Sequence, residues 1–364
     1  MTDADGDLAC LALREPQRLM SGTLCQWESV IRQAARADVL GRLAVMLDSL
    51  GLTEAVPPAP RLHLTVARQV VFAQHQELRR EMALILAAVK DLDIPVVFLK
   101  GAAYVAANLP AARGRLCSDI DILVPKSALP EVEGRLMLHG WMSTHHDAYD
   151  QRYYREWMHE LPPMQHVRRG TVIDVHHGLL PETVRRPPNA ALLLAAARAV
   201  SGLPGAQVLD APDMVLHSMT HLFHNEEFSH GLRDLSDVDL LLRHHGDDVD
   251  FWASLLRRAS TLHLQRNLYY GLFAVREAFG TPVPAQVWAE AAPAAPTPVM
   301  RALMQGLWRR GLRGPHAMAA LPWTSTATLL LYLRAHWLRM PPLLLARHLS
   351  IKAWKRATVK PVAV

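Results

Sequence analysis

β-strand patterns are confined to one part of this chain, where they alternate with helical patterns. Residues 65–92 carry apolar side chains at the three- and four-residue spacing of a helix, and Pro95 then opens the apolar run VVFL. An alanine-rich helical segment, the run DIDILV and a helix that closes on Gly140 follow. Two further β-runs flank Gly170 and indicate a hairpin. This order predicts a small mixed sheet with helices packed on it.

The rest of the chain has mostly helical patterns. The segment PPAPRL predicts a break before the long helix, and beyond Pro187 the pattern is almost wholly helical. We therefore expect an α+β protein in which a small sheet domain is embedded in a mostly helical chain. The expected regions are an N-terminal helical region (1–64), the sheet domain (65–185), a helical domain that closes a cleft (186–290) and a basic helical C-terminal region (291–364).

Composition excludes several classes of protein. Hydrophobic residues make up 50% and charged residues 20%, the balance of an ordinary globular protein. The three cysteines, Cys10, Cys25 and Cys117, are scattered and odd in number, which argues against a disulfide framework and a Cys-based zinc site. The N-terminus lacks a signal-peptide pattern, and no uncharged run has the composition of a transmembrane helix. These features predict a cytoplasmic protein.

Charge is unevenly distributed along the chain. From Arg301 onward there are 11 Lys and Arg and no Asp or Glu, whereas residues 1–300 hold 28 basic and 34 acidic residues. Such a basic tail is expected to attract an anionic partner, namely a nucleic acid, a membrane surface or an acidic protein. The alternative is a basic face that only contacts solvent.

Two carboxylates begin the apolar run DIDILV. Side chains alternate between the faces of a strand, so Asp119 and Asp121 share one face, about 7 Å apart at Cα. Carboxylates at this spacing can bind one hard cation, and Mg²⁺ with its waters and phosphate oxygens is the usual one. The alternative is a strand start whose acidic side chains reach solvent. A second D-x-D, Asp237 and Asp239, lies in a helical pattern, where residues two apart point about 200° away from each other.

Possible phosphate-binding groups surround the first pair. Lys100 and Gly101 stand where a strand turns into a helix, and such a turn offers a positive charge and free backbone N–H groups. Arg113, Arg115 and Ser118 lie in the loop before the aspartates, within reach of further phosphate oxygens. An ordinary strand-to-helix turn would explain Lys100 and Gly101 equally well.

A third carboxylate, Asp174, lies inside the apolar run TVIDVHH. On a strand next to the first pair it would complete a two-metal site, of the kind that activates a hydroxyl and stabilises a leaving pyrophosphate. The motifs of serine hydrolases, P-loop proteins and Rossmann dinucleotide-binding proteins do not occur in the sequence.

The combined motif FLKGAAY…RLCSDIDILV…VIDVHHGLL, within residues 80–245, resembles the nucleotidyltransferases of the DNA polymerase β superfamily, and most closely an uncharacterised bacterial branch. The resemblance implies that Asp119, Asp121 and Asp174 bind two Mg²⁺ ions and carry catalysis. It implies that Lys100, Gly101, Arg115 and Ser118 bind the nucleotide. The Lys-Gly-Ala turn departs from the Gly-Gly or Gly-Ser of the wider superfamily, as that branch does.

A helix that follows the sheet domain carries regularly spaced histidines. His217, His221 and His224 stand four and seven residues apart, on one helical face. Two of them could bind zinc, or they could pack, but the resembling branch has histidines and an Asp like Asp237 here. We therefore expect these side chains, with His176, to face the cleft.

The resemblance implies transfer of a nucleotidyl group from an NTP to an acceptor that the sequence does not identify: a small molecule, a peptide, a protein or an RNA end. Two alternatives remain open. One is a toxin-like nucleotidyltransferase that acts on tRNA, and the other is a non-catalytic relative that binds a partner. Retention of all three carboxylates argues against the second alternative.

Overall fold

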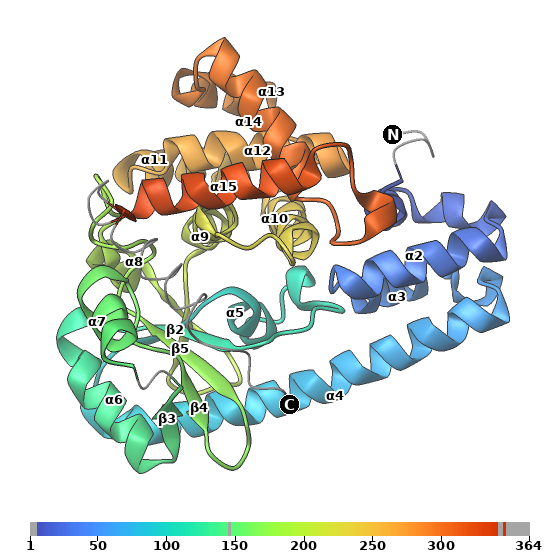
Figure 1. Ribbon diagram of the computed structural model, residues 1–364. Helices are drawn as coiled ribbons and strands as arrows, with labels where there is room; N and C mark the ends of the chain where they lie inside the picture. Colours follow the sequence, from blue (N-terminus) through green and yellow to red (C-terminus); the bar gives the residue numbers. More distant parts are fainter. Residues whose placement is uncertain (1–5, 145–146, 341–344, 347–364) are drawn as a thin grey trace.

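Seven strands form one mixed sheet in the part of the chain that the computed structural model describes, residues 6–144, 147–340 and 345–346 (Figure 1). Across the sheet their order is β3-β4-β5-β2-β1-β7-β6. β2 runs parallel to β5 and β7 runs parallel to β1, while the remaining neighbours are antiparallel. The strands are β1 (Val96–Phe98), β2 (Ile120–Leu123), β3 (Trp141–Ser143), β4 (Met164–His166), β5 (Val172–His176), β6 (Arg198–Ala199) and β7 (Ala206–Val208).

Helices precede, interrupt and follow the sheet. Before it come α1 (Leu8–Arg14), α2 (Leu24–Arg36), α3 (Leu40–Ser49) and α4 (Pro58–Val89). Between its strands lie α5 (Lys100–Ala106), α6 (Leu129–Leu138), α7 (Ala148–Trp157) and α8 (Ala190–Ala196). After it come α9 (Ala211–His224), α10 (Gly231–His245), α11 (Phe251–Thr261), α12 (Gln265–Phe279), α13 (Ala285–Ala291), α14 (Pro298–Gly311) and α15 (Thr324–Arg339). The α+β fold predicted from the sequence is confirmed.

The predicted break at residues 57–62 is wrong. α4 starts at Pro58 and is continuous to Val89, so the expected domain boundary after residue 64 falls inside this helix. Proline is well tolerated in the first turn of a helix, where the backbone N–H has no partner within the helix. The prolines here begin the helix rather than interrupt it.

The almost wholly helical pattern expected beyond Pro187 is also incorrect at one place. β6 and β7 form a hairpin there, and β7 pairs with β1 in the middle of the sheet. The region from α9 onward is helical as predicted. The hairpin around Gly170 is confirmed, with β4 antiparallel to β5.

α5 lies between the sheet and the later helices. It packs against β1, β2 and β7 and also contacts α9. α4 passes along the lower edge in Figure 1 and contacts α2, α3, α5 and α6, so it joins the N-terminal helices to the sheet. α9 contacts α10, α11, α12 and α15. The first residues of α5 are thus enclosed by the sheet on one side and by helices on the other.

The centre of the sheet is buried on both faces. All four residues of β2 are buried, and Asp121 is only 2% exposed to solvent. The alternative that the acidic side chains at the start of this strand reach solvent is therefore wrong for Asp121. Cys10, Cys25 and Cys117 are free thiols.

Among the described helices, none combines the length and the apolar composition needed to cross a membrane. Of the predicted basic C-terminal region (291–364), residues 341–344 and 347–364 lie outside the described residues.

Candidate active site

The register of two parallel strands brings two of the predicted carboxylates together. Asp121 on β2 lies directly opposite Asp174 on β5, and neighbouring strands are about 4.8 Å apart. Asp119 immediately precedes β2. Burial, followed by the charge of Asp121, raises the pKa of Asp119. Burial and the charges of Asp121 and Glu160 raise the pKa of Asp174 to about 8. The three acids thus form a crowded cluster of negative charge.

Lys100 balances part of this negative charge. It begins α5 with φ of +45°, a left-handed conformation that is uncommon for a residue with a side chain. Its Nζ lies 2.9 Å from Asp121 Oδ1. Burial alone would lower the pKa of Lys100, but the carboxylates of Asp121 and Asp119 outweigh burial and raise it. Lys100 is therefore a cation held beside the carboxylates.

His176 supports Asp121 from the other side. Its Nε2 lies 2.9 Å from Asp121 Oδ1, and its Nδ1 lies 3.1 Å from Glu160 Oε2. Burial acts to lower the pKa of His176, yet the hydrogen bond to Asp121 and the charge of Glu160 raise it. Lys100 and His176 together hold the pKa of Asp121 well below its usual range despite burial. Asp121 is thus an ionised carboxylate fixed at Oδ1.

A cavity opens beside Lys100, Asp119 and Asp121, whereas Asp174 and His176 are not among its lining residues. Many of the predicted site residues line the cavity: Lys100, Gly101, Arg115, Ser118, Asp119, Asp121, His221 and Asp237. The sequence did not single out the others: Tyr104, Ser218, Asn225, His230, Arg233 and Asp234. The loop before β2, α5, α9 and α10 all contribute, so sheet and helical region build one site.

Gly101 is required by the packing of its neighbours. A Cβ at this position would lie 2.3 Å from Arg115 Nη1 and 2.6 Å from Cys117 Sγ. Arg115 in turn is held by Asp237, whose Oδ2 accepts from Arg115 Nε at 2.8 Å. The sequence assigned Gly101 to close approach of a phosphate, whereas the structure gives it a second reason, the space that the Arg115 side chain occupies.

Asp237 joins three segments of the chain. Its Oδ1 accepts from Arg42 Nη2 on α3 at 2.7 Å, while its Oδ2 accepts from Arg115 in the loop before β2. Burial would raise the pKa of Asp237, but Arg115 and Arg42 outweigh burial and lower it. Asp237 is therefore an ionised, buried anchor for Arg115 at the wall of the cavity.

Ser118 and Arg113 differ in position. Ser118 lines the cavity and its Oγ donates to Asp119 Oδ1 at 3.0 Å. Arg113 is exposed and is not among the cavity residues. Of the two, only Ser118 is placed to meet a ligand beside the carboxylates.

The three regularly spaced histidines lie in α9 as predicted, but in different surroundings. His221 lines the cavity. Burial, followed by the charge of Lys100, lowers the pKa of His217 to about 3. The Nδ1 of His224 is 3.2 Å from both the Thr220 carbonyl oxygen and Asn267 Nδ2 on α12, so His224 packs within the helices. The structure brings His221 to the cavity and places neither His217 nor His224 among its lining residues.

The second D-x-D lies on α10, with its carboxylates directed to different partners. Asp237 meets Arg42 and Arg115, while Asp239 Oδ1 accepts from Arg243 Nε at 2.7 Å and from Thr281 Oγ1 at 2.6 Å. The helical interpretation of this pair is confirmed.

His159 and Glu160 are neighbours of the site that sequence reasoning missed. An isolated antiparallel bridge pairs Glu160 with His176. The sequence around position 160 has no strand pattern, because this single bridge is formed with a residue distant in the sequence. The dipeptide His-Glu was the one local signal available.

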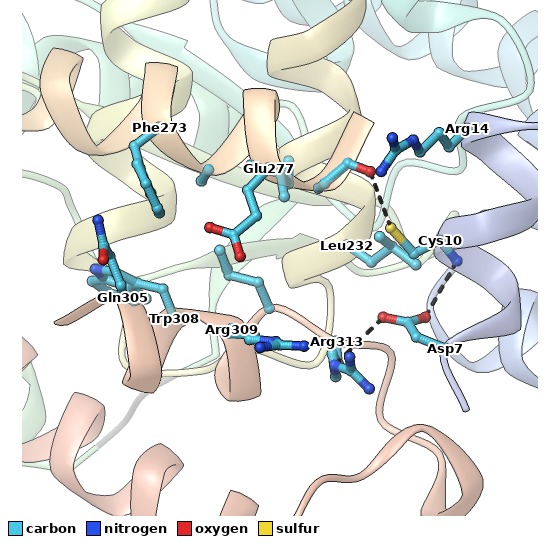
Figure 2. A pocket seen from close by; sticks show the side chains of 14 residues that line it. Asp7, Cys10, Arg14, Leu232, Phe273, Glu277, Gln305, Trp308, Arg309 and Arg313 are labelled. Atoms are coloured by element: carbon cyan, nitrogen blue, oxygen red, sulfur yellow. Dashed lines mark hydrogen bonds and ion pairs between the residues drawn. The ribbon is translucent and has the colours of Figure 1, made fainter. Parts of the chain in front are cut away.

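A second cavity, with an empty volume of about 910 Å³, lies between α1, α10, α12 and α14 (Figure 2). Cys10 is its potential nucleophile, and the Sγ lies 3.7 Å from the carbonyl oxygen of Ala278. Burial, followed by the charge of Asp7, raises the pKa of the Cys10 thiol to about 12. The thiol therefore stays protonated at neutral pH, and this cavity offers no activated thiolate.

A family model described as an uncharacterised nucleotidyltransferase matches residues 24–280. The chain belongs to this family. The matched residues contain the sheet, α9, α10 and the carboxylate cluster, so the nucleotidyltransferase resemblance drawn from the motif is confirmed. No curated protein and no solved structure matches the chain.

The carboxylate cluster of this nucleotidyltransferase suits a hard cation. Asp174 Oδ1 is buried and has no hydrogen-bond partner among the described residues. A buried carboxylate oxygen without a partner is costly unless a cation or a donor meets it. Asp119, Asp121 and Asp174 offer the oxygen ligands that Mg²⁺ prefers.

Proposed function

We propose that this protein is a Mg²⁺-dependent nucleotidyltransferase that moves a nucleoside monophosphate from an NTP to an acceptor. One observation carries the proposal: Asp121 and Asp174 are directly opposite each other on parallel strands, with Lys100 and a cavity beside Asp121. The family supports nucleotidyl transfer in general. We also propose kinship with the DNA polymerase β superfamily and a bacterial origin, on the basis of the motif.

The proposed roles follow from position. Asp119, Asp121 and Asp174 would hold Mg²⁺, which when bound would neutralise the cluster and polarise phosphate oxygens. Lys100 and Ser118, both at the cavity, would orient the triphosphate. Arg115 would form the wall, fixed by Asp237.

Asp174 would act on the acceptor. As the acceptor oxygen bonds to the α-phosphorus, the bond to pyrophosphate breaks and the acceptor proton leaves. Asp174, directly opposite Asp121 on the neighbouring strand, would orient the acceptor and take up this proton. The acceptor remains a class: a small molecule, a peptide, a protein or an RNA end.

Label transfer from α-labelled NTPs tests the proposal. Each of the four NTPs would be incubated with Mg²⁺ and with the protein itself, RNA or a panel of hydroxyl-bearing small molecules, and pyrophosphate release followed in parallel. We expect Asp119→Asn and Asp121→Asn to reduce transfer to below about 1% of the wild-type rate. Asp174→Asn should lower transfer with less loss of NTP binding.

Asp239→Asn is the matched control. Asp239 belongs to the other D-x-D, is buried and ion-paired like Asp121, and is not among the residues that line the cavity. This variant should keep most of the activity. Full activity in Asp119→Asn and Asp121→Asn would exclude the proposed metal site.

A further inference from the structure

A second cluster of metal-binding side chains lies next to the carboxylates. His159 and Glu160 follow α7, and the backbone of this segment pairs with the end of β5. Leu161 N–H donates to the Val175 carbonyl at 2.9 Å, and His177 N–H donates to the His159 carbonyl at 2.8 Å. These two hydrogen bonds fix the register that places Glu160 beside His176.

The ligand atoms of the cluster are close enough to share one ion. One nitrogen each from His159 and His176 and one carboxylate oxygen from Glu160 lie within 4.8 Å of one another. The Nδ1 of His176 is 3.1 Å from Glu160 Oε2. Ligands on a tetrahedral zinc ion, with bonds of about 2.0–2.1 Å, are about 3.3 Å apart. Small side-chain rotations would therefore complete the geometry.

His159 supplies an independent sign of a missing partner. Its Nδ1 is buried and has no hydrogen-bond partner among the described residues. A buried ring nitrogen that is neutral and unpartnered loses the hydrogen bond it would make in water. A metal ion bound there would satisfy it.

The surroundings of His176 are those of a metal ligand. Its Nε2 lies 2.9 Å from Asp121 Oδ1, and donation of an Nε2–H to that oxygen would leave the lone pair of Nδ1 for a metal ion on the Glu160 side. Metal-binding histidines almost always donate their second ring N–H to a carboxylate or a carbonyl, which fixes the tautomer and the ring orientation.

We propose that His159, Glu160 and His176 bind one transition-metal ion, with zinc the best match to two imidazoles and a carboxylate. This site is separate from the proposed Mg²⁺ site, whose ligands are all oxygens. The bound ion would cross-link residues 159–161 to β5 and hold His176 in the orientation that supports Asp121. Water would occupy the remaining coordination position. The proposal does not rest on nucleotidyl transfer.

Metal binding to the full-length protein tests the site. The protein would be stripped with a chelator, titrated with Zn²⁺ or Co²⁺, desalted and analysed for bound metal by mass spectrometry. We expect one equivalent of Zn²⁺, a visible Co²⁺ absorption of a four-coordinate site, and a higher melting temperature with Zn²⁺ than with chelator. His159→Ala and Glu160→Gln should each weaken Zn²⁺ binding by more than about tenfold, since even supporting residues are worth 10–100-fold.

Two controls separate this proposal from the others. His63→Ala removes an exposed histidine of α4 and should leave Zn²⁺ binding unchanged, so it is the surface control for His159→Ala. Asp119→Asn should lose nucleotidyl transfer yet keep Zn²⁺, so the two proposals fail independently. Circular dichroism checks that His159→Ala is folded, and Glu160→Gln preserves side-chain shape. The proposal is overturned if the wild type retains no Zn²⁺, or if folded His159→Ala and Glu160→Gln bind it as tightly as the wild type. His176 would then be a protonated histidine between two carboxylates.

Discussion

Gly101 stands where the chain has no room for a Cβ. The guanidinium of Arg115 and the thiol of Cys117 fill the space that a Cβ would occupy. Arg115 cannot move away freely, because Asp237 holds its Nε. The position of Arg115 in the cavity wall therefore depends on the absence of a side chain at residue 101.

Gly101→Ala is expected to destabilise the protein. Overpacking of a buried site costs about 1–3 kcal/mol in the free energy of unfolding. The displaced Arg115 should also weaken NTP binding. Urea unfolding gives the first quantity and calorimetry the second.

Gly134→Ala is the matched control for this substitution. Gly134 lies inside α6, and nothing lies within 4 Å of a Cβ built there. Alanine should therefore stabilise the helix by about 0.5–1 kcal/mol. Equal changes in the free energy of unfolding for the two substitutions would contradict the packing argument. Unchanged NTP affinity in Gly101→Ala would show that Arg115 does not contribute to nucleotide binding.

Among the elements, α3 is tied to α10 by a buried ion pair. The Nη2 of Arg42 on α3 donates to Asp237 Oδ1 on α10 at 2.7 Å and to the Ala111 carbonyl at 2.6 Å. Both charged side chains are almost fully buried. The pair connects the N-terminal helices to the cavity wall.

Arg42→Met should remove one of the two arginine partners of a buried carboxylate, leaving Arg115. We expect a loss of at most about 3–5 kcal/mol in the free energy of unfolding, the cost of breaking a buried pair, because Arg115 still compensates part of the charge of Asp237. Arg68→Met is the control, since it breaks an ion pair with Asp48 in which both side chains are exposed. That pair is worth about 0–1 kcal/mol. Urea unfolding compares the two, and equal losses would contradict the role of Arg42.

α9 carries a pH-sensitive histidine, His224. Burial, followed by the charges of Arg334 and Arg339, lowers its pKa to about 3. The unfolded chain binds a proton near pH 6.5, whereas the folded chain does not, so stability falls as pH drops from about 6.5 to 3.

His224→Gln removes this titration. Between pH 7.5 and pH 4.5 the variant should lose about 2 kcal/mol less stability than the wild type, as measured by urea unfolding at both values. At pH 7.5 it should be somewhat less stable, because His224 packs against Asn267. His63→Gln on the exposed face of α4 serves as the control. An unchanged pH dependence in His224→Gln would show that other groups control acid unfolding.

Strand patterns with strong local signals were predictable, and short paired strands were not. β1 consists of consecutive apolar residues, and β2 is apolar except for Asp121, so the apolar pattern identified both strands. β7 has only three residues, Ala206–Val208, and exists because it pairs with β1 more than a hundred positions earlier. The bridge between Glu160 and His176 has the same origin, which is why the sequence predicted Asp174 and His176 but not Glu160.

In the whole molecule, the site is assembled from parts that are distant in the sequence. α3 and α10 clamp the loop before β2, while β2 and β5 present the carboxylates. The sequence predicted the chemistry of each motif, because side-chain types and strand faces are local properties. It did not predict that Asp237 anchors Arg115, because that contact depends on how the helices pack on the sheet.

The last prediction concerns the basic tail. Residues 346–364 hold five Lys and Arg and no acidic residue, so deleting them changes the formal net charge from +5 to 0. If the tail attracts an anionic partner, its deletion should reduce binding to that partner. The binding of the full-length protein should also weaken with added salt, because charge attraction is screened beyond about 10 Å at 0.1 M ionic strength. Sedimentation with anionic vesicles and gel shift with RNA distinguish the two targets.

A charge variant completes this test. Replacing the same five residues by Gln keeps the chain length and should reduce binding as much as deletion does. The helices up to α15 should remain folded in both variants, since α15 packs against α14 and α9. Full-length protein that binds neither vesicles nor RNA at low salt would show that the tail is a solvated basic segment. Binding lost on deletion but kept in the Gln variant would point to apolar contacts from its Trp and Leu residues instead.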